Sequence, residues 1–166
     1  PIPEGPHPNV KDGKSPNVDS PLSNAPSYDI ELLKRYQEQI NLEDVTKIRL
    51  SRHKMLRFCH APFFEDLVRG CFVRIYIGKN EEDEPVYRLC EIVGLVESND
   101  VYDFEDTRVD QKLVVKQGES SNTFRLTYVS NGPFTDVEFQ RWLRLLATQN
   151  SPIPSKRYLR EKAESL

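Results

Sequence analysis

The side chains in this sequence best suited to chemistry are arginines, and they gather in one block of the chain. Between Val45 and Tyr76 there are seven basic and two acidic residues, a local charge of +5 in a chain whose total is −3. Arginine outnumbers lysine in this block, and its planar guanidinium binds phosphate through two parallel hydrogen bonds. The block therefore indicates a local site for an anion. A solvated face paired with the acidic stretches at 81–84 and 97–106 gives the same pattern and stays open as an alternative.

Aromatic side chains interleave with arginines in the part of the chain where strands are expected. This combination suits stacked nucleic-acid bases, and it equally suits the proline and aromatic side chains of a bound peptide. Filling the core of the fold is the third explanation, and periodicity alone leaves Tyr128 open between core and contact surface. The aromatic residues concerned are Phe72, Tyr76, Tyr87, Phe124 and Tyr128, close in sequence to Arg74, Arg88 and Arg125.

Cysteine and histidine, a common nucleophile and a common base, form no catalytic arrangement in the sequence. Cys59 and His60 are neighbours, and adjacent residues of a helix point about 100° apart, which suits no nucleophile–base pair. The sequence contains no nucleophile elbow, no phosphate-binding glycine loop and no HExxH motif. We therefore predict a non-enzymatic protein that needs no cofactor.

The same residues do not form a metal site either. Zinc ligands usually come as two close pairs, and here Cys59 and His60 form one such pair, with His53 and Cys71 apart from it. The third cysteine is Cys90, and no two of the three cysteines have the CxxC spacing. We predict no metal ion, and buried, reduced cysteines of an intracellular protein.

Length and composition favour one domain of a larger protein. A chain of 166 residues is long enough for one core and short for two. It opens at Pro1 rather than Met, so we expect a piece of a longer chain. Neither a run of about 18 apolar residues nor a signal sequence occurs, so no membrane association is expected. The net negative charge argues against a bulk nucleic-acid binder.

The N-terminal half is expected to be a disordered arm followed by helices of a domain over 27–149. Residues 1–26 hold seven of the 12 prolines among small polar residues and offer almost nothing to bury. The alternating run VTKIRL predicts a short strand over 45–50. Amides at the start of a helix that Ser51 caps would add to the attraction for an anion. Apolar spacing and capping residues predict helices over 29–40, 52–60 and 62–69.

From Cys71 the periodicity changes from helical to two, which predicts strands within 71–130, the last three being the runs VYDF, KLVVKQ and TFRLTYVS. Gly94, inside the long run PVYRLCEIVGLVE, indicates a bulge or bend. Five or so short strands with one bent strand predict a small, twisted β-barrel in an α+β protein. After them, Thr135 and Glu138 form a capping box, and Trp142 belongs to an apolar core stripe. The last predicted elements are a helix over 136–148 and a helical extension over 150–166.

Several blocks of the sequence, in order and at matching separations, point to a known family. They are IRLSRHKMLRFCHAPFFEDLVRGCFVRI, PVYRLCEIVGLVES, FRLTYVSN and FTDVEFQRWL. Over roughly 42–149 the chain resembles the Plus-three domain, and the LSRHK and CFVRI blocks favour the type found in the Rtf subunit of the polymerase-associated factor (Paf) complex. The resemblance implies a Tudor-like β-barrel flanked by N- and C-terminal helices, no catalysis and a location in the nucleus.

The resemblance also implies a binding function. Domains of this kind bind phosphorylated C-terminal repeats of the Spt-family elongation factor, the large subunit of the NusG-like pair. That contact brings the Paf complex to transcribing RNA polymerase II. Single-stranded DNA binding through the same basic and aromatic surface is the alternative. The implied partners are a phosphothreonine peptide, Paf subunits outside this domain and, in the alternative, single-stranded DNA, with the domain itself monomeric.

Residue roles carry over from the family position by position. Arg52 in LSRHK matches the arginine that binds phosphothreonine, and Tyr128 in FRLTYVSN matches an aromatic residue that contacts the repeat. The second phosphate arginine of the family falls at Asn122 or a neighbour, which is not basic here. Its candidate substitutes are Arg74, Arg125 and Arg108. Further expected anion or nucleic-acid contacts are Arg49, Lys54, Arg88 and Arg108.

Overall fold

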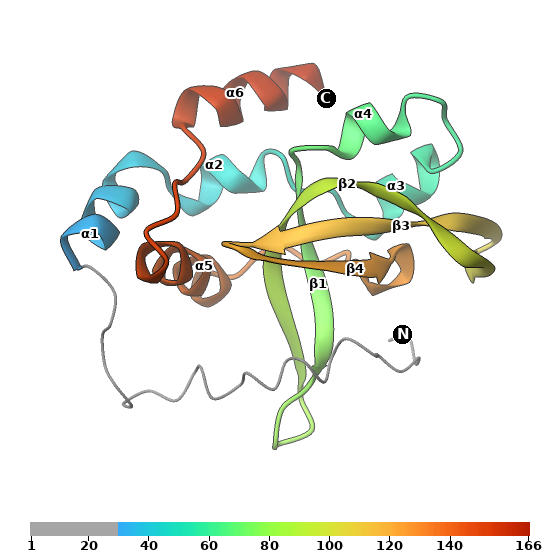
Figure 1. The fold of residues 1–166 in the computed structure, drawn as a ribbon, viewed down its shortest axis with the longest axis horizontal. Helices are drawn as coiled ribbons and strands as arrows, with labels where there is room; N and C mark the ends of the chain where they lie inside the picture. Colours follow the sequence, from blue (N-terminus) through green and yellow to red (C-terminus); the bar gives the residue numbers. More distant parts are fainter. Residues whose placement is uncertain (1–29) are drawn as a thin grey trace.

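The computed structural model describes residues 30–166, so the predicted arm at 1–26 and the first residue of the helix predicted over 29–40 lie outside this part of the chain. Within it, helices and strands follow one another in the order shown in Figure 1. The elements are α1 (Ile30–Gln39), α2 (Leu42–Thr46), α3 (Arg52–Phe58), α4 (Phe64–Val68), β1 (Phe72–Lys79), β2 (Pro85–Phe104), β3 (Thr107–Gln117), β4 (Ser120–Arg125), the 3-10 helix η2 (Leu126–Tyr128), α5 (Asp136–Thr148) and α6 (Lys156–Ser165).

The strands form one antiparallel sheet in the order β1-β2-β3-β4. β2 is long enough to pair with β1 along its first part and with β3 along the rest. The register shifts between Ile92 and Gly94, which confirms the bulge predicted at this glycine. A second shift lies between Glu97 and Tyr102, on the way to the hairpin tip. These irregularities accompany the curvature of β2 seen in Figure 1.

The α+β class and the twisted sheet flanked by helices are confirmed, but the expected barrel is not closed. β1 and β4 are the two ends of the sheet and form no ladder with each other. The chain returns to β1 only after η2, through an isolated antiparallel bridge between Ile75 and Val129. Beside that bridge, the amide of Ser130 donates to the carbonyl of Arg74 at 2.9 Å. The sheet is therefore open, and the segment that follows η2 lies against its first strand.

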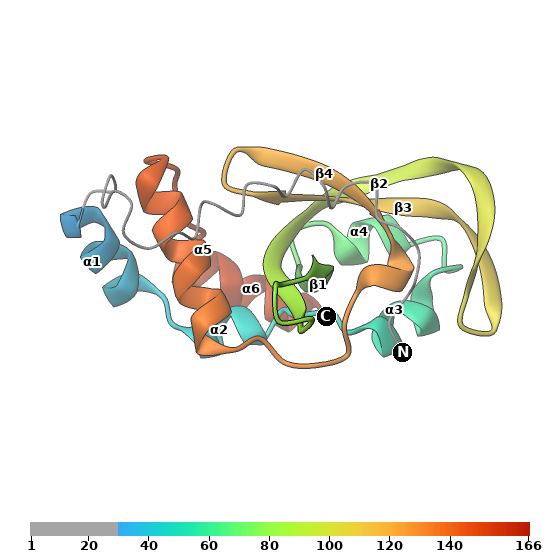
Figure 2. The same ribbon diagram turned by 90° about the horizontal axis from the view of Figure 1, so that it is seen from below.

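The helices form two groups. α1 packs against α5 and α2 packs against α6, and these four lie together at one end of the molecule (Figures 1 and 2). The hydroxyl of Tyr36 in α1 donates to the carbonyl of Ser151, which ties α1 to the segment between α5 and α6. α4 contacts β2 and α3 contacts η2. As a result, α3 lies next to the segment that returns to β1.

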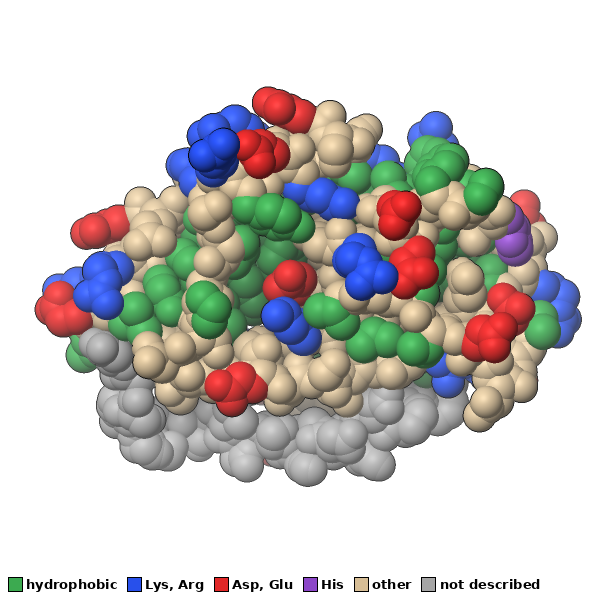
Figure 3. Space-filling model, turned by 45° about the horizontal axis from the view of Figure 1, so that its top comes forward, with side chains coloured by type: hydrophobic (Ala, Val, Ile, Leu, Met, Phe, Trp, Pro, Cys, Tyr) green, Lys and Arg blue, Asp and Glu red, His purple; other side chains and the backbone are tan. Residues whose placement is uncertain are grey.

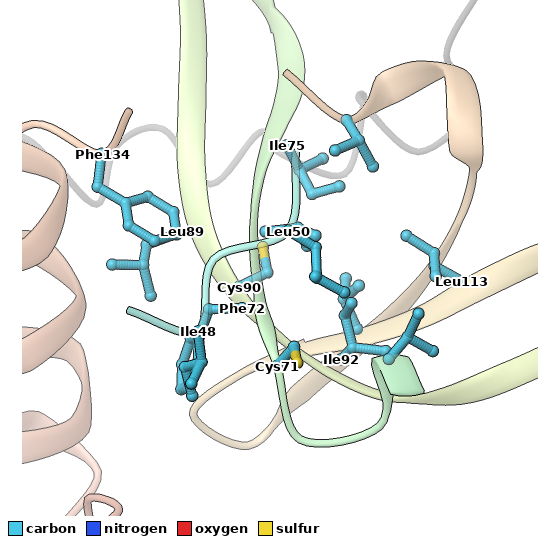
Figure 4. Packing of buried hydrophobic residues seen from close by; sticks show 14 of the residues in the cluster. Ile48, Leu50, Cys71, Phe72, Ile75, Leu89, Cys90, Ile92, Leu113 and Phe134 are labelled. Atoms are coloured by element: carbon cyan, nitrogen blue, oxygen red, sulfur yellow. The ribbon is translucent and has the colours of Figure 1, made fainter. Parts of the chain in front are cut away.

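One apolar core joins the sheet to both groups of helices. Figure 4 shows part of it, with Phe134, from the segment before α5, packed beside Leu89 of β2. Phe72 of β1 is fully buried and meets Trp142 of α5 edge to face, with ring centroids 5.4 Å apart. Trp142 is buried, so its predicted place in the core is confirmed.

The strand predicted over 45–50 is wrong. Most of the VTKI run lies in α2 and the turn after it, because Asn41 and Asp44 form a capping box in which each side chain accepts a hydrogen bond from the other's amide. This local hydrogen bonding outweighs the β-branched alternation of the run. Arg49, at the end of the run, makes a single parallel bridge to Phe72.

The described residues contain four strands rather than the expected five or so. The run VYDF, expected to be a separate strand, continues β2, because the chain rejoins the ladder at Tyr102 after the second bulge. The run TFRLTYVS, also expected as a strand, begins in β4 but leaves the sheet after Arg125 and turns into η2. The continuation of VYDF in β2 accounts for the difference in strand count, and the turn into η2 only shortens the last strand.

The substitution Thr135→Ala tests the capping box that begins α5. The Thr135 hydroxyl accepts from the amide of Glu138 at 3.1 Å, and the Glu138 carboxylate accepts from the amide of Thr135. We expect the free energy of unfolding to fall by about 1 kcal/mol, because a helix amide loses its acceptor. Urea denaturation followed by circular dichroism measures the change. Thr148→Ala, at the exposed far end of the same helix, is the matched control, and an equal loss in both variants would contradict the capping role.

Candidate anion-binding site

Three arginines from three different segments converge on the four residues that follow η2, which we call the 129–132 loop. Arg52 of α3 donates through Nε to the carbonyl of Val129 at 2.9 Å. Arg74 of β1 donates through Nη1 to the hydroxyl of Ser130 at 3.1 Å. Arg49, just before α3, donates through Nη1 to the carbonyl of Asn131 at 3.5 Å. Three of the seven basic residues of the sequence block are thus gathered around one loop.

The 129–132 loop is fixed by hydrogen bonds on both sides. Its Ser130 hydroxyl accepts from the amide of Gly132 at 2.8 Å, which closes a tight turn. The side chain of Asn131 accepts from the amide of His53 in α3 at 2.8 Å. A Cβ atom at Gly132 would lie 3.1 Å from Nη1 of Arg74, so the arginine approaches the backbone closely there. The loop therefore holds the guanidinium groups in fixed positions.

The helix amides expected to attract an anion are already hydrogen-bonded. The amide of Lys54 donates to the hydroxyl of Ser51, the N-cap of α3, at 3.1 Å. The amide of His53 donates to Asn131, as described above. These two N–H groups do not face a ligand, so that expectation is corrected, and the guanidinium groups remain as the anion donors of this region.

The guanidinium of Arg74 is bound by other side chains of the domain and is mostly buried. It forms an ion pair with Glu138 of α5, with Nη2 2.9 Å from Oε2 and side chains only 16% and 11% exposed. Its Nε lies 3.0 Å and 3.1 Å from the two carboxylate oxygens, and its guanidinium lies 3.9 Å above the ring of Tyr87. Every nitrogen of this guanidinium has a protein partner, so Arg74 has a structural role in the described state.

Arg52 combines a fixed position with access to solvent. Its Nε is held by Val129, while its Nη1 lies 3.1 Å from the carboxylate of Glu105 at the tip of the β2–β3 hairpin. Its side chain is 20% exposed and that of Glu105 is 45% exposed. An ion pair this open is weak, because water screens both charges. Arg52 is therefore held in place at one nitrogen and partly exposed, with a weak ion pair at another.

Arg49 has no carboxylate partner among residues 30–166. Its Nε is buried without a hydrogen-bond partner, the one such side-chain nitrogen or oxygen in the described part of the chain. Burial, and then the nearby charge of Arg74, lower the pKa of the Arg49 guanidinium, which nevertheless stays protonated because arginine starts so high. An anion beside Arg49 would relieve both effects.

Tyr128 belongs mainly to the core of this region. It is 9% exposed and stacks on Tyr76, with ring centroids 6.5 Å apart and planes 12° apart. Phe124 meets it edge to face, and Tyr76 meets Tyr87 in the same way. Four of the five aromatic residues that alternate with arginines in the sequence thus pack against one another, and the fifth, Phe72, packs against Trp142. Tyr128 therefore has little surface left for a ligand.

The other predicted site residues lie outside the 129–132 loop and have contacts of their own. Arg125 pairs with Asp100 at 2.8 Å and lies over Tyr102 at 4.7 Å. Arg108 pairs with Asp103 at 3.2 Å. Arg88 donates to the carbonyl of Tyr87 at 3.3 Å. Lys54 is exposed on α3, and Asn122 is exposed on β4, where it pairs with Val115 of β3.

Three of the seven basic residues of the block pair with carboxylates, and only one of these carboxylates, that of Glu105, comes from the acidic stretches that the alternative interpretation named. On the face shown in Figure 3, basic and acidic side chains are interspersed. Two of the acidic partners were missed by sequence analysis as parts of this site. Glu138 stood out only as a capping residue, and Glu105 only as one member of the acidic stretch 97–106, because its pairing with Arg52 depends on how the β2–β3 hairpin folds back onto α3.

The cysteines are buried and free. Burial raises the pKa of Cys71 to about 11 and that of Cys90 to about 12, and it also raises the pKa of Cys59. Thiols of this kind stay protonated at neutral pH and are poor nucleophiles. Residues 30–166 hold no group of three potential metal ligands, and no helix among them is long and apolar enough to cross a membrane.

The fold and the 129–132 loop define a class: a small α+β domain that presents guanidinium groups beside a fixed loop. A family model described as the Plus-3 domain matches residues 44–147, and the chain belongs to this family. The match begins just before the arginine block and ends within α5, so it includes every residue of the 129–132 loop and its arginines.

Curated relatives agree with the family assignment. An RNA polymerase-associated protein of Schizosaccharomyces pombe is 34% identical over 145 residues, 86% of this chain and 26% of the relative. The RNA polymerase-associated protein RTF1 homolog of Caenorhabditis elegans is 35% identical over 125 residues, 75% of this chain and 20% of the relative. The protein RTF1 homolog of Arabidopsis thaliana is 31% identical over 128 residues, which are 75% of this chain and 20% of the relative. The chain thus spans about a fifth to a quarter of these proteins.

The variant Arg74→Ala tests whether this arginine is structural. It would leave the carboxylate of Glu138 mostly buried without a counter-charge, so we expect the free energy of unfolding to fall by about 3 kcal/mol. Arg125→Ala, which breaks the exposed pair with Asp100, should cost less than about 1 kcal/mol. Urea denaturation of both variants makes the comparison. Equal small losses would mean that Arg74 is free to bind a ligand after all.

Proposed function

We propose that the chain is a non-enzymatic phosphopeptide-binding module of the nuclear transcription elongation machinery. Its ligand is a phosphothreonine-containing C-terminal repeat of the Spt-family elongation factor, and binding recruits the Paf complex to transcribing RNA polymerase II. One observation carries the proposal: Arg52 is anchored by the carbonyl of Val129 while its side chain remains partly exposed and makes only a partly exposed ion pair with Glu105. Membership of the Plus-3 family and relatives named as RNA polymerase-associated proteins support the cellular setting.

The chemistry of a phosphothreonine suits the 129–132 loop. A phosphate group carries nearly two negative charges and three acceptor oxygens, more than one guanidinium neutralises. Arg52 supplies the first cation, and its Nε bond to Val129 fixes the plane in which the outer N–H groups point. Peptide residues next to the phosphothreonine would then pass the edge of Tyr128. A small, partly exposed site of this kind implies a dissociation constant of roughly 10 to 100 μM per repeat, and tandem repeats raise the effective affinity.

Arg49 is our proposed second phosphate arginine. The three substitutes expected for the non-basic Asn122 position each have a carboxylate partner already: Arg74 with Glu138, Arg125 with Asp100, and Arg108 with Asp103. Arg49 has none in the described part of the chain and donates to the loop residue Asn131, two positions from the residue that anchors Arg52.

The burial of the aromatic side chains favours a peptide over single-stranded DNA. Binding of single-stranded nucleic acid without sequence preference relies on exposed rings on which bases stack. Here Tyr76, Phe124 and Tyr128 are each less than 10% exposed, and the face of Tyr87 is covered by Arg74. Single-stranded DNA nevertheless belongs in every binding experiment as the competing ligand.

A titration of repeat peptides with and without phosphothreonine tests the function. At about 150 mM salt, where long-range charge effects are screened, we expect the phosphopeptide to bind at least about tenfold more tightly than the plain peptide. Arg52→Ala should abolish this preference, and Arg57→Ala, an exposed arginine on the same helix, should keep it. Calorimetry or fluorescence anisotropy gives the constants. Equal binding of both peptides, with tight binding of single-stranded DNA, would refute the phosphopeptide assignment.

The variant Arg49→Ala tests the second cation. We expect it to weaken phosphopeptide binding about fivefold to tenfold, because one charge-assisted hydrogen bond to the phosphate is lost. Binding of the unphosphorylated peptide should stay the same. Lys47→Ala removes an exposed positive charge two residues away and is the matched control. If both variants bind the phosphopeptide equally well, Arg49 does not contact the phosphate.

A further inference from the structure

The tip of the β2–β3 hairpin places a carboxylate on the arginine of the proposed phosphate site. Glu105 lies between the last residue of β2 and the first pairs of β3, and its backbone has a left-handed φ of 55°. Its Oε2 lies 3.1 Å from Nη1 of Arg52, although the two residues are 53 positions apart in the chain. Non-glycine residues rarely adopt this backbone conformation, so the tip is held in a particular shape.

Neighbouring residues fix that shape. Phe104, just before Glu105, is fully buried in the core. Thr107, just after the tip, is hydrogen-bonded through its hydroxyl to Nε2 of His60 at 2.9 Å, which ties the hairpin to the turn after α3. Figures 1 and 2 both show the hairpin beside α3. The backbone under Glu105 is therefore anchored on both sides, while its side chain is exposed enough to swing away.

We infer that Glu105 is a resident counter-anion on Arg52, which the phosphate of the ligand displaces, and that it thereby sets the selectivity of the site. The inference rests on the proposed function and names a residue that sets which anions the proposed site prefers. Arg52 keeps its bond from Nε to Val129 throughout, so the exchange takes place at its outer nitrogens and requires no movement of the loop.

The selectivity follows from comparing the two anions. A carboxylate on a ligand would replace one carboxylate by another and gain little. A phosphate offers nearly twice the charge and three acceptor oxygens, so it gains from the exchange. The pair that must be broken is partly exposed and therefore inexpensive to break. Glu105 thus disfavours singly charged acidic peptides while it leaves phosphorylated ones able to bind.

Glu105→Gln removes the charge and keeps the shape of the side chain. We expect this variant to bind the phosphothreonine peptide about threefold to tenfold more tightly than the wild-type chain, because no carboxylate competes for Arg52. We also expect a peptide with glutamate in place of phosphothreonine to bind the variant clearly better than the plain peptide, whereas the wild-type chain treats the two alike. Glu65→Gln, which breaks the exposed pair with Arg69, is the matched control and should change neither affinity by more than about twofold.

A second readout separates this inference from the proposed function. Inorganic phosphate is titrated into both proteins while the NMR signal of the Arg52 Nε–H group is followed, and saturation should come at a lower phosphate concentration in Glu105→Gln. If the phosphopeptide binds the wild-type chain but Glu105→Gln binds it equally or more weakly, the exchange is refuted and the function stands. If the phosphopeptide binds neither protein but phosphate still saturates Arg52 earlier in the variant, the exchange stands and the function fails. If phosphate affects neither protein, both are refuted.

Discussion

The mostly buried ion pair between Arg74 and Glu138 is the interaction on which the arrangement of this domain depends. It joins β1, the 129–132 loop and α5, three parts of the chain that no continuous ladder connects. Removing two charges from water is costly, and the cost is offset only when the remaining hydrogen-bonding groups find partners. Here they do: Arg74 also donates to Ser130, and Glu138 also accepts from the amide of Thr135. The pair therefore fixes where the open sheet ends and where α5 begins.

This pair also decides which positive charges are left for a ligand. Counting residues 45–76 gives a local charge of +5, but the count does not show which of these side chains are already paired with carboxylates. Arg74 forms an ion pair with Glu138 in the interior, Arg69 pairs with Glu65, and Arg52 pairs with Glu105. In the site that we propose at the 129–132 loop, binding would depend on the fixed orientation of two guanidinium groups more than on the amount of charge.

Local signals in the sequence were enough to predict several parts of the fold. Gly94 marked a bulge, Thr135 and Glu138 marked the start of a helix, and the spacing around Trp142 marked a core stripe, because each depends on residues within one or two turns of the chain. The run at 45–50 was misjudged because a capping box formed by Asn41 and Asp44, just upstream, overrode its alternation. The family pattern singled out Arg52, but nothing local could reveal its anchoring by Val129 or its pairing with Glu105, since both partners are more than 50 residues away.

The three buried cysteines provide a chemical measure of how often the structure of the domain opens. Cys71 and Cys90 are completely inaccessible and Cys59 nearly so, in the core that joins the sheet to the helices. A thiol reagent reaches such groups only when the surrounding structure opens, so the rate of alkylation measures how often it does. Because Cys59 lies beyond the end of α3 and Cys90 lies in β2, the two rates distinguish fraying around the helix from separation of the sheet. Ligand binding at the 129–132 loop should slow both reactions to the extent that it stabilises the whole domain.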